Sequence, residues 1–370
     1  MKKRFFVTAV IIYSLVTIYF GAGLFLFPQE AYSENENRML TTLPSVRISS
    51  IFDKSLFKSL DKFSTDQFPH RNLFLKANAI YDLSLARLES GSVMLGNNAL
   101  IKRLEYTDTS EAKKSLNGIN RLINIANDNG AHAIFMCPPI SSAVLVDQCP
   151  NFYANESLNK ATDLIKSECD EVIFITDMLQ KRASDGEYVY YKTDHHWTTL
   201  GAYYAYLELG KYLGYTPYEK EDFEIKVLSD NFLGTSYTAS LIPISYSDKI
   251  TAFRFSDDSN ISVKDMITGE ILELYDKEKL RTASKYDVFL DGNRAHIEIK
   301  NGEKPDLIIV KDSFANSLVP FLTRHYNITL IDPRYVRGDV YKLVSDVIES
   351  KNAPLLILIN IDTIFTGTGL

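Results

Sequence analysis

Residues 190–206 read YYKTDHHWTTLGAYYAY and contain an aspartate followed by two adjacent histidines. Asp194, His195 and His196 precede Trp197, the only tryptophan of the chain. Three interpretations are open for such a group: a metal site, a catalytic acid–base pair, or a solvated helix start without chemistry. Asp194 and His196 are one residue apart, and alternate side chains of extended backbone project to the same side. This spacing suits a histidine base and the carboxylate that orients it.

The metal interpretation is the weaker of the two chemical ones. Ligands of zinc have to converge on the ion, whereas adjacent residues of an extended chain point apart. The sequence offers no further ligand cluster with HxxxH or similar spacing. We therefore predict no metal and no other cofactor, and keep a metal-dependent hydrolase as an alternative.

A second polar cluster, KDSFANS at 311–317, directly follows the apolar run DLIIV. Ser313 lies where this predicted strand becomes a helix, and free N–H groups at a helix start can hold a developing oxyanion. Serine is a weak nucleophile unless a base takes its proton, and histidine is the usual base. The alternative for Ser313 is a helix cap without catalysis. If the site is catalytic, Asp194, His196 and Ser313 converge at one edge of a sheet.

The elements that must position these residues alternate between helix and strand, the rhythm of a parallel α/β sheet. Polar sites of such sheets gather beyond the carboxyl ends of the strands. Residues 51–88 are predicted helical with a break around Pro69, and 92–104 as a hairpin that turns at 96–98. The remaining pattern predicts helices at 110–129, 155–169, 199–213, from 315 and at 339–350, and strands at AHAIFMCPP, EVIFIT, DLIIV, ITLID and LLILIN.

Residues 218–300 interrupt this rhythm. They are rich in charged and aromatic residues and in short alternating runs such as RAHIEIK. Alternation with period two is typical of strands. We interpret the segment as a mostly β insertion within an α/β domain that covers residues 51–370.

The N-terminus predicts a membrane anchor. Lys2, Lys3 and Arg4 form a basic flank at 1–4, and residues 5–27 contain no charged residue. Such a stretch is long enough to cross a hydrocarbon core of about 30 Å. The basic flank stays in the cytoplasm, which places the rest of the chain outside it. A cleaved signal sequence and a buried N-terminal helix are the alternatives. Residues 28–50 are interpreted as a juxtamembrane linker.

Composition sets broad limits. The chain has 370 residues, of which 45% are hydrophobic and 24% charged, as in globular proteins. A net charge of −7 gives no general attraction to nucleic acid, so we expect no nucleic-acid partner. Cys137, Cys149 and Cys169 form no CxxC pair, which argues against a zinc knuckle. Either one disulfide, Cys137 to Cys149, or three small buried thiols fit this spacing.

With TDHHW, KDSFANSLVPFL and IDPRY together, the chain resembles the DHHW protein family. SENENR, DQFPHR and NFLGTSY also resemble segments of that family, so the resemblance covers nearly all of the chain. The family is related to the alginate O-acetyltransferases of the AlgX and AlgJ type. The resemblance implies an SGNH-hydrolase-like α/β fold of three layers, in which the Asp–His segment precedes the serine.

Residue by residue, the resemblance implies a catalytic triad. Ser313 is the expected nucleophile, His196 the base, and Asp194 its orienting carboxylate. Asp312 is expected to form structural hydrogen bonds at the Asp-Ser turn. Lys311 stands where SGNH enzymes commonly have a glycine, which is a departure from the pattern.

The remaining site residues have less definite roles. The Ser313 backbone N–H is expected to be one oxyanion donor, with Asn316 or Arg334 as a second. His195 is a neighbour that bonds backbone, a substrate contact or a support for the turn. Trp197 either packs under the loop or stacks on a sugar. Asp332 and Arg334 form either a pair that shapes the pocket or a surface pair.

The function implied by the resemblance is a bacterial, extracytoplasmic serine acyl-transfer enzyme. It is an O-acetyltransferase, or an acetylesterase, that acts on a cell-surface polysaccharide through an acyl-enzyme. Its expected partners are the polysaccharide acceptor, the membrane, and a membrane-bound O-acyltransferase that supplies acetyl groups. A non-catalytic polysaccharide-binding or assembly protein of the same fold is the main alternative.

Overall fold

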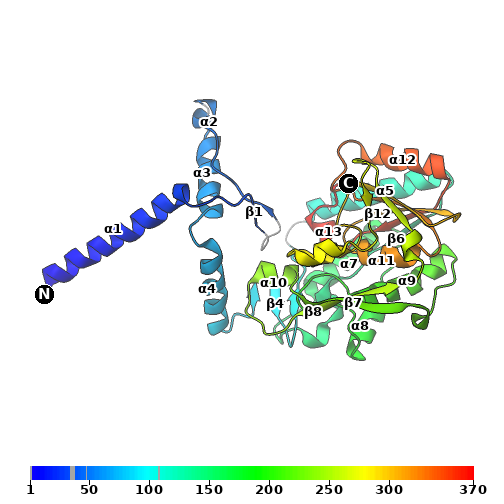
Figure 1. Ribbon diagram of the computed structural model, residues 1–370, viewed down its shortest axis with the longest axis horizontal. Helices are drawn as coiled ribbons and strands as arrows, with labels where there is room; N and C mark the ends of the chain where they lie inside the picture. Colours follow the sequence, from blue (N-terminus) through cyan, green and yellow to red (C-terminus); the bar gives the residue numbers. More distant parts are fainter. Residues whose placement is uncertain (1, 34–37, 47, 107–108) are drawn as a thin grey trace. The chain divides into compact units, whose positions relative to one another are not determined.

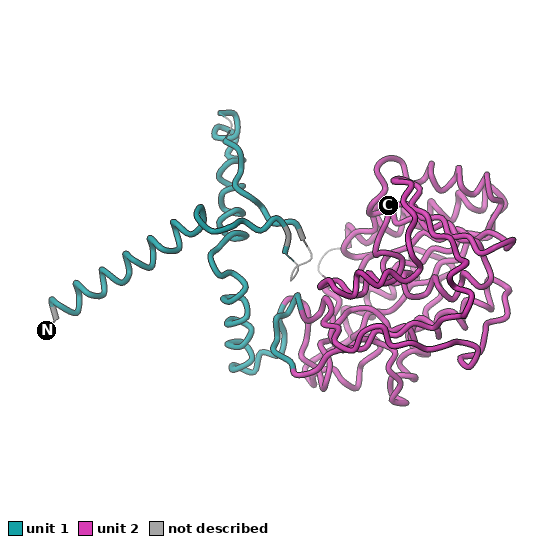
Figure 2. Tube along the Cα trace, viewed as in Figure 1, with its two compact units in different colours: residues 1–90, 238–244 teal, residues 91–237, 245–370 magenta. Residues whose placement is uncertain are grey.

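The computed structural model describes residues 2–33, 38–46, 48–106 and 109–370. The chain divides into two compact units, residues 1–90 with 238–244, and residues 91–237 with 245–370 (Figure 2). Met1 of the predicted basic flank and residues 34–37 of the SENENR segment lie outside the described residues.

The first unit is built around a long apolar helix. Residues 3–26 of this helix are long and apolar enough to cross a membrane, by length and composition. The rings of Phe20 and Phe68 stack at 5.1 Å, and those of Phe25 and Phe63 lie 6.0 Å apart. The elements of this unit are α1 (Lys2–Leu26), β1 (Tyr32–Ser33), β2 (Arg38–Met39), α2 (Ile48–Phe52), α3 (Ser55–Asp66), α4 (Arg71–Ser84) and β3 (Glu89–Ser90).

These contacts differ from the predicted division of the chain. The helices α3 and α4 and the turn between them contact α1, and the larger unit begins at Gly91 rather than at residue 51. The predicted linker at 28–50 contains the paired strands β1 and β2 and the helix α2. The predicted break at Pro69 is present, because α3 ends at Asp66 and α4 begins at Arg71.

The second unit contains a seven-stranded mixed sheet with strand order β10-β9-β11-β13-β12-β14-β6. Strands β13, β12, β14 and β6 are parallel, whereas β11, β9 and β10 add to them in antiparallel pairs. The strands are β6 (Ala133–Met136), β9 (Ser262–Asp265), β10 (Ile271–Leu272), β11 (His296–Lys300), β12 (Asp306–Lys311), β13 (Asn327–Ile331) and β14 (Leu355–Leu358).

Helices cover both faces of this sheet, which gives three layers. On β12, Leu307 and Ile309 belong to one apolar core, and Ile308 and Val310 to the other, because alternate side chains face opposite sides. The first core contains side chains of α8 (Thr176–Ser184), α9 (Thr199–Leu213) and α11 (Ala315–Leu322). The second contains side chains of α5 (Ser110–Asp128), α7 (Glu156–Glu168), α12 (Val340–Lys351) and α13 (Ile361–Thr366) (Figure 1).

Two predictions about strands were wrong. EVIFIT forms no strand, because only Ile173 pairs with β6, as a single bridge to Met136, before α8 begins at Thr176. Residues 218–300 do contain several strands, as predicted, but the segment is not an insertion beside the sheet, since β9, β10 and β11 extend the main sheet. Their apolar positions are buried there, as Val263, Ile297 and Ile299 show.

The remaining elements are short. The predicted hairpin at 92–104 is present as the antiparallel pair β4 and β5. Cys137, Cys149 and Cys169 are all free thiols, so the disulfide interpretation was wrong. The elements not yet named are β4 (Val93–Leu95), β5 (Leu100–Lys102), α6 (Ser141–Val144), η1 (Val146–Gln148), η2 (Lys220–Asp222), β7 (Glu224–Phe232), α10 (Thr235–Ser240), β8 (Asp248–Arg254), η3 (Asp258–Asn260), η4 (Lys277–Arg281) and η5 (Lys285–Val288).

Candidate active site

Ser313 lies in the turn between β12 and α11, at the carboxyl end of a central strand. Asp312 holds this turn in place. One of its carboxylate oxygens accepts the Phe314 N–H at 2.9 Å. The other accepts the Asn360 N–H and the Thr363 hydroxyl, both at 2.7 Å. Asp312 and Phe314 are buried while Ser313 between them is partly exposed, so the turn presents the serine hydroxyl toward solvent.

His196 contacts Ser313 directly, although 117 residues separate them in the chain. Its Nε2 lies 2.7 Å from Ser313 Oγ, and its Nδ1 lies 2.6 Å from Asp194 Oδ1. A carboxylate only accepts hydrogen bonds, so the Nδ1–H of a neutral ring donates to Asp194. Nε2 is then free to accept the Ser313 hydroxyl proton, which is the arrangement of a general base.

Asp194 is buried and fully engaged by hydrogen bonds. Oδ1 also accepts the His196 backbone N–H at 2.9 Å, and Oδ2 accepts the backbone N–H and the hydroxyl of Thr235 at 2.8 and 3.0 Å. Burial alone raises the pKa of Asp194, but the neighbouring His196 and His195 and these hydrogen bonds hold it below its usual range. The carboxylate is therefore ionised at neutral pH.

The loop that carries Asp194 is fixed from two sides. Asp248, at the start of β8, accepts the backbone N–H groups of Lys192 and Thr193 at 2.8 and 2.7 Å. On the other side, a Cβ atom at Gly234 would lie 2.3 Å from the Asp194 Cβ. Only glycine permits this close approach, which explains a glycine in the NFLGTSY segment.

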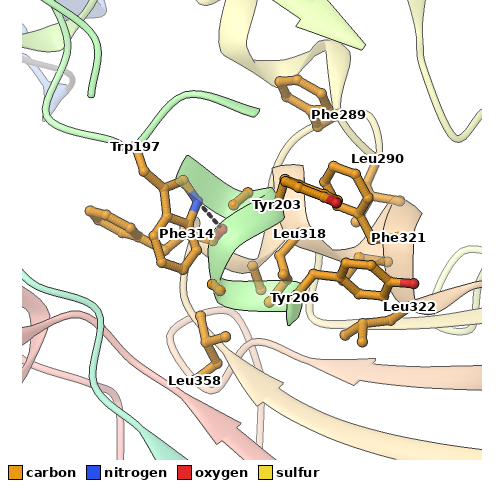
Figure 3. Packing of buried hydrophobic residues seen from close by; sticks show 14 of the residues in the cluster. Trp197, Tyr203, Tyr206, Phe289, Leu290, Phe314, Leu318, Phe321, Leu322 and Leu358 are labelled. Carbon is orange, nitrogen blue, oxygen red and sulfur yellow. Dashed lines mark hydrogen bonds between the residues drawn. The ribbon is translucent and has the colours of Figure 1, made fainter. Parts of the chain in front are cut away.

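Aromatic rings surround the imidazole of His196. The Tyr286 ring is stacked on it at 4.0 Å between centroids, with 6° between the planes. The Phe314 ring lies 4.9 Å away. Trp197 is fully buried, and its Nε1–H donates to the Phe314 carbonyl at 3.0 Å (Figure 3). Trp197 therefore packs beneath the loop, and the sugar-stacking alternative is excluded because no face of the indole is exposed.

His195 is linked to Asp194 through a threonine hydroxyl. Its Nδ1 hydrogen bonds to the Thr235 hydroxyl, which donates to Asp194. Burial, together with the neighbouring His196, lowers the pKa of His195 to about 3, so its ring is neutral at neutral pH. Its side chain is 31% exposed, which leaves part of the ring open to solvent.

Asp194, His195 and His196 also satisfy a distance criterion for a metal site, since one ligand atom from each lies within 4.8 Å of the others. Three of the four ring nitrogens are engaged, however. Nδ1 of His196 faces Asp194, Nδ1 of His195 faces Thr235, and Nε2 of His196 faces Ser313. A metal ion would have to break this hydrogen-bonded chain, so the arrangement fits a metal poorly and an acid–base relay well.

Lys311 and Asn316 belong to a buried polar network beside the turn. Lys311 Nζ donates to Asn316 Oδ1 at 2.7 Å and to Asn293 Oδ1 at 2.9 Å, and lies 3.6 Å from Asp332. Asn316 Nδ2 donates to Asn293 at 3.2 Å. The amide of Asn316, a predicted oxyanion donor, is thus fully buried and engaged within this network. Lys311, noted in the sequence as a departure from the expected pattern, is thus a buried amine held by this network.

Arg334 and Asp332 form a bidentate pair, with Nε and a terminal nitrogen 2.9 and 2.7 Å from the two carboxylate oxygens. The Arg334 side chain is 27% exposed, but Asp332 is buried. The two residues therefore do not form a surface pair. The Ser313 backbone N–H has no hydrogen-bond acceptor among the described residues, which leaves it available to a ligand oxygen.

Several residues of the site were not found from the sequence. Thr235, Gly234 and Asp248 hold the Asp194 loop, and Tyr286 stacks on His196. Gly234 and Thr235 lie in NFLGTSY, which the sequence analysis related to the family without assigning a role to either residue. The carbonyls of Pro138 and Pro139 accept hydrogen bonds from the Asn360 side-chain amide, both at 2.9 Å.

Known proteins resemble this chain in sequence or in fold. A family model described as "DHHW protein" matches residues 136–331, more than half of the chain. The structure of Bacillus cereus PatB1 with a sulfonyl adduct is similar, with a TM-score of 0.58, 21% identity, and coverage of 74% of this chain and 95% of that one. A DHHW family protein from Eubacterium siraeum has a TM-score of 0.55 and 20% identity, with coverage of 74% and 94%.

These two likenesses show a shared mixed α/β fold. The O-acetyltransferase domain of Pseudomonas putida AlgJ is also similar, at a TM-score of 0.47 and 12% identity, with coverage of 75% of this chain and 92% of that one. That likeness is too weak to support an argument about function. No curated protein sequence matches the chain.

Proposed function

The chain belongs to the DHHW protein family, and from that premise we propose that it is an extracytoplasmic serine acyl-transfer enzyme that moves or removes O-acetyl groups on a cell-surface polysaccharide. One observation carries the proposal: hydrogen bonds of 2.6 and 2.7 Å connect Asp194, His196 and Ser313 in that order. A carboxylate, an imidazole and a serine hydroxyl in this order form the arrangement that activates a serine.

The reaction follows from this order. His196 Nε2 accepts the proton of Ser313 Oγ as the oxygen attacks the carbonyl carbon of an acetyl ester. The negative charge that develops on the carbonyl oxygen is stabilised by the free Ser313 N–H. Asp194 stabilises the imidazolium, which gives its proton to the departing alcohol and leaves Ser313 acetylated. A sugar hydroxyl or water, deprotonated by His196, then takes the acetyl group.

We infer the acetyl group as the transferred group, and a polysaccharide as its acceptor, from the family resemblance. The resemblance also supplies the partner that we propose, a membrane-bound O-acyltransferase that delivers acetyl groups. Location is supported by α1, which fits a single-pass anchor by its length and composition. Lys3 and Arg4 lie at its N-terminal end, so we propose that the catalytic unit faces the outside.

The relative of shared fold, PatB1, was solved with a sulfonyl adduct. Sulfonyl halides are electrophiles that modify activated nucleophiles, so they provide a direct probe of Ser313. We expect a sulfonyl fluoride to modify the full-length chain once, at Ser313, and to stop hydrolysis of a chromogenic acetyl ester. Modification that requires Ser313 and His196 together would support the proposed pair.

Ser313→Ala tests the proposal most simply. If Ser313 is the nucleophile, the substitution lowers turnover of the acetyl ester by about 10⁴–10⁶-fold. If Ser313 only caps the helix, the substitution lowers the free energy of unfolding by about 0.5–2 kcal/mol and leaves turnover intact. Ser350→Ala is the matched control, since Ser350 is exposed near the end of α12 and bonds only its own helix, at the Val347 carbonyl. If Ser313→Ala remains as active as Ser350→Ala, the proposed function is wrong.

A further inference from the structure

The ring of Tyr286 is stacked on the imidazole of His196. Tyr286 lies in η5, within the segment whose pattern predicted an insertion, and its ring is nearly parallel to the imidazole, at 4.0 Å and 6°. Parallel stacking at this distance presents the ring face, rather than the ring edge, to His196. The face of an aromatic ring carries partial negative charge.

Tyr286 is itself fixed at both ends. Its hydroxyl donates to the Ser313 carbonyl at 3.3 Å and shares a hydrogen bond of 3.1 Å with Ser317 Oγ. Ser317 Oγ in turn accepts the Trp197 Nε1–H at 3.1 Å. The Phe289 ring packs against the Tyr286 ring at 5.4 Å, and Tyr286 is buried. The ring therefore cannot swing away from the imidazole without breaking contacts to the serine turn.

We propose that Tyr286 is a positioning residue for His196: its ring holds the imidazole plane between Asp194 and Ser313, and its face favours the protonated imidazole. Attraction between a cation and a ring face is strongest where water is excluded, as it is at this buried ring. The interaction is thus greater with the imidazolium than with the neutral ring. The effect of this interaction on acyl transfer rests on the proposed function, because in that reaction the imidazolium forms as Ser313 loses its proton.

Other charged and titratable groups also face His196. Asp194 bonds its Nδ1, the neutral His195 ring lies 3.8 Å from it, and the partly buried carboxyl of Asp287 is next to Tyr286 in the chain. Both carboxylates favour the imidazolium when ionised, although burial raises the pKa of Asp287. A test must therefore change the ring and leave these groups in place.

Three substitutions at one position separate the ring from the hydroxyl. Tyr286→Phe keeps the ring and removes the hydrogen bonds, whereas Tyr286→Leu and Tyr286→Met remove the ring and keep the site apolar. Phe289→Leu is the control, because it removes an equally buried ring that contacts Tyr286 in the same segment. Fluorescence of Trp197, the only tryptophan, checks that each full-length variant folds.

The readout is the titration of the His196 ring by NMR in the full-length protein, with the signal identified by its loss in His196→Gln. In Tyr286→Leu and Tyr286→Met we expect the midpoint to move to lower pH by roughly 0.4–1.5 units. In Tyr286→Phe and Phe289→Leu it stays at the wild-type value. The acid limb of kcat/KM for an acetyl ester moves in the same way.

Either of two results overturns the inference: an unchanged midpoint in a folded ring-deletion variant, or a shift in Tyr286→Phe as large as in Tyr286→Leu. The first excludes the ring as the cause, and the second assigns the effect to the hydroxyl. A midpoint that moves as expected in a protein without acyl-transfer activity would support the Tyr286–His196 interaction and contradict the proposed function. The two claims therefore fail separately.

Discussion

At the scale of single residues, the candidate site depends on how Asp194 is kept ionised in a buried place. A buried carboxylate without partners becomes protonated, because burial disfavours its charged form. Here four donors and two neighbouring histidines outweigh burial. The same contacts leave the Asp194 oxygens no role toward substrate, so the residue acts through His196.

Asp194→Asn tests this role. The amide keeps the shape of the side chain but not its charge, so the imidazolium loses its stabilisation and the His196 tautomer is no longer fixed. We expect turnover of an acetyl ester to fall by about 10³–10⁴-fold, with a smaller loss in affinity. An Asp194→Asn enzyme with near wild-type kcat would exclude Asp194 from the triad.

Lys311 predicts a dependence of stability on pH. Burial lowers the pKa of Lys311 to about 8, from an ordinary value of 10.5. Between these two values the unfolded chain binds more protons than the folded one, so the free energy of unfolding rises with pH. Relative to Lys311→Met, the wild type should gain about 3 kcal/mol from pH 8 to pH 10.5.

Denaturant titrations at both pH values, followed through Trp197 fluorescence, measure this gain. Charges common to both proteins cancel in the comparison. A difference between wild type and Lys311→Met that stays constant across this pH range would contradict the assigned burial of a charged Lys311.

At the scale of elements, the site is where a loop, a strand end and two helix starts meet. The 190–197 loop ends as Thr198 caps α9 by accepting the Gly201 N–H at 3.3 Å. Thr235, the first residue of α10, bonds Asp194, and the Gly234 N–H donates to the Thr193 hydroxyl. Gly234 is the point of closest approach between these elements.

Gly234→Ala is expected to displace the Asp194 carboxylate, since the added Cβ would lie 2.4 Å from its Oδ2. Overpacking of this kind costs about 1–3 kcal/mol in stability, and we expect kcat of an acetyl ester to fall more than KM changes. Gly269→Ala, in the turn that joins β9 and β10, is the control for backbone strain alone, because its φ is +78° and its Cβ would meet no atom within 4 Å. Equal losses of activity in both variants would contradict the contact as the cause.

Periodicity and caps predicted the elements whose signals are local. The helices expected at 110–129, 199–213 and 339–350 appear as α5, α9 and α12 within one or two residues. EVIFIT has the apolar run of a strand, but its chain meets β6 at Ile173 alone, which no local pattern reveals. The role of Tyr286 was equally hidden, because its partners Ser313 and His196 lie far from it in sequence.

At the scale of the whole molecule, the proposed location of the chemistry rests on the N-terminal helix. Residues 3–26 of α1 have a mean hydropathy of 2.1 in their most apolar window. A membrane anchor and a signal sequence differ in whether this helix remains on the mature chain. The acceptor that we propose, a cell-surface polysaccharide, is accessible only if the large unit is outside.

We expect a reporter enzyme fused after Leu370 to be active only outside the cytoplasm, and the intact mass of the mature protein to include residues 3–26. We expect the protein to be extracted from membranes by detergent and to stay in the membrane fraction during a wash with alkaline carbonate. A reporter active inside the cell would overturn both the topology and the polysaccharide assignment. Loss of the first helix from the mature chain would support the signal-sequence alternative.

The central claim is that Ser313 carries the acyl group, and trapping the acyl-enzyme tests it most directly. The full-length protein is mixed with an activated acetyl ester, quenched in acid within the first turnovers, and digested for mass spectrometry. The account predicts one acetyl group on the peptide that contains Ser313, absent from Ser313→Ala and strongly reduced in His196→Ala. Rapid ester turnover by a protein that never carries acetyl on Ser313, or that keeps its activity in Ser313→Ala, would contradict it.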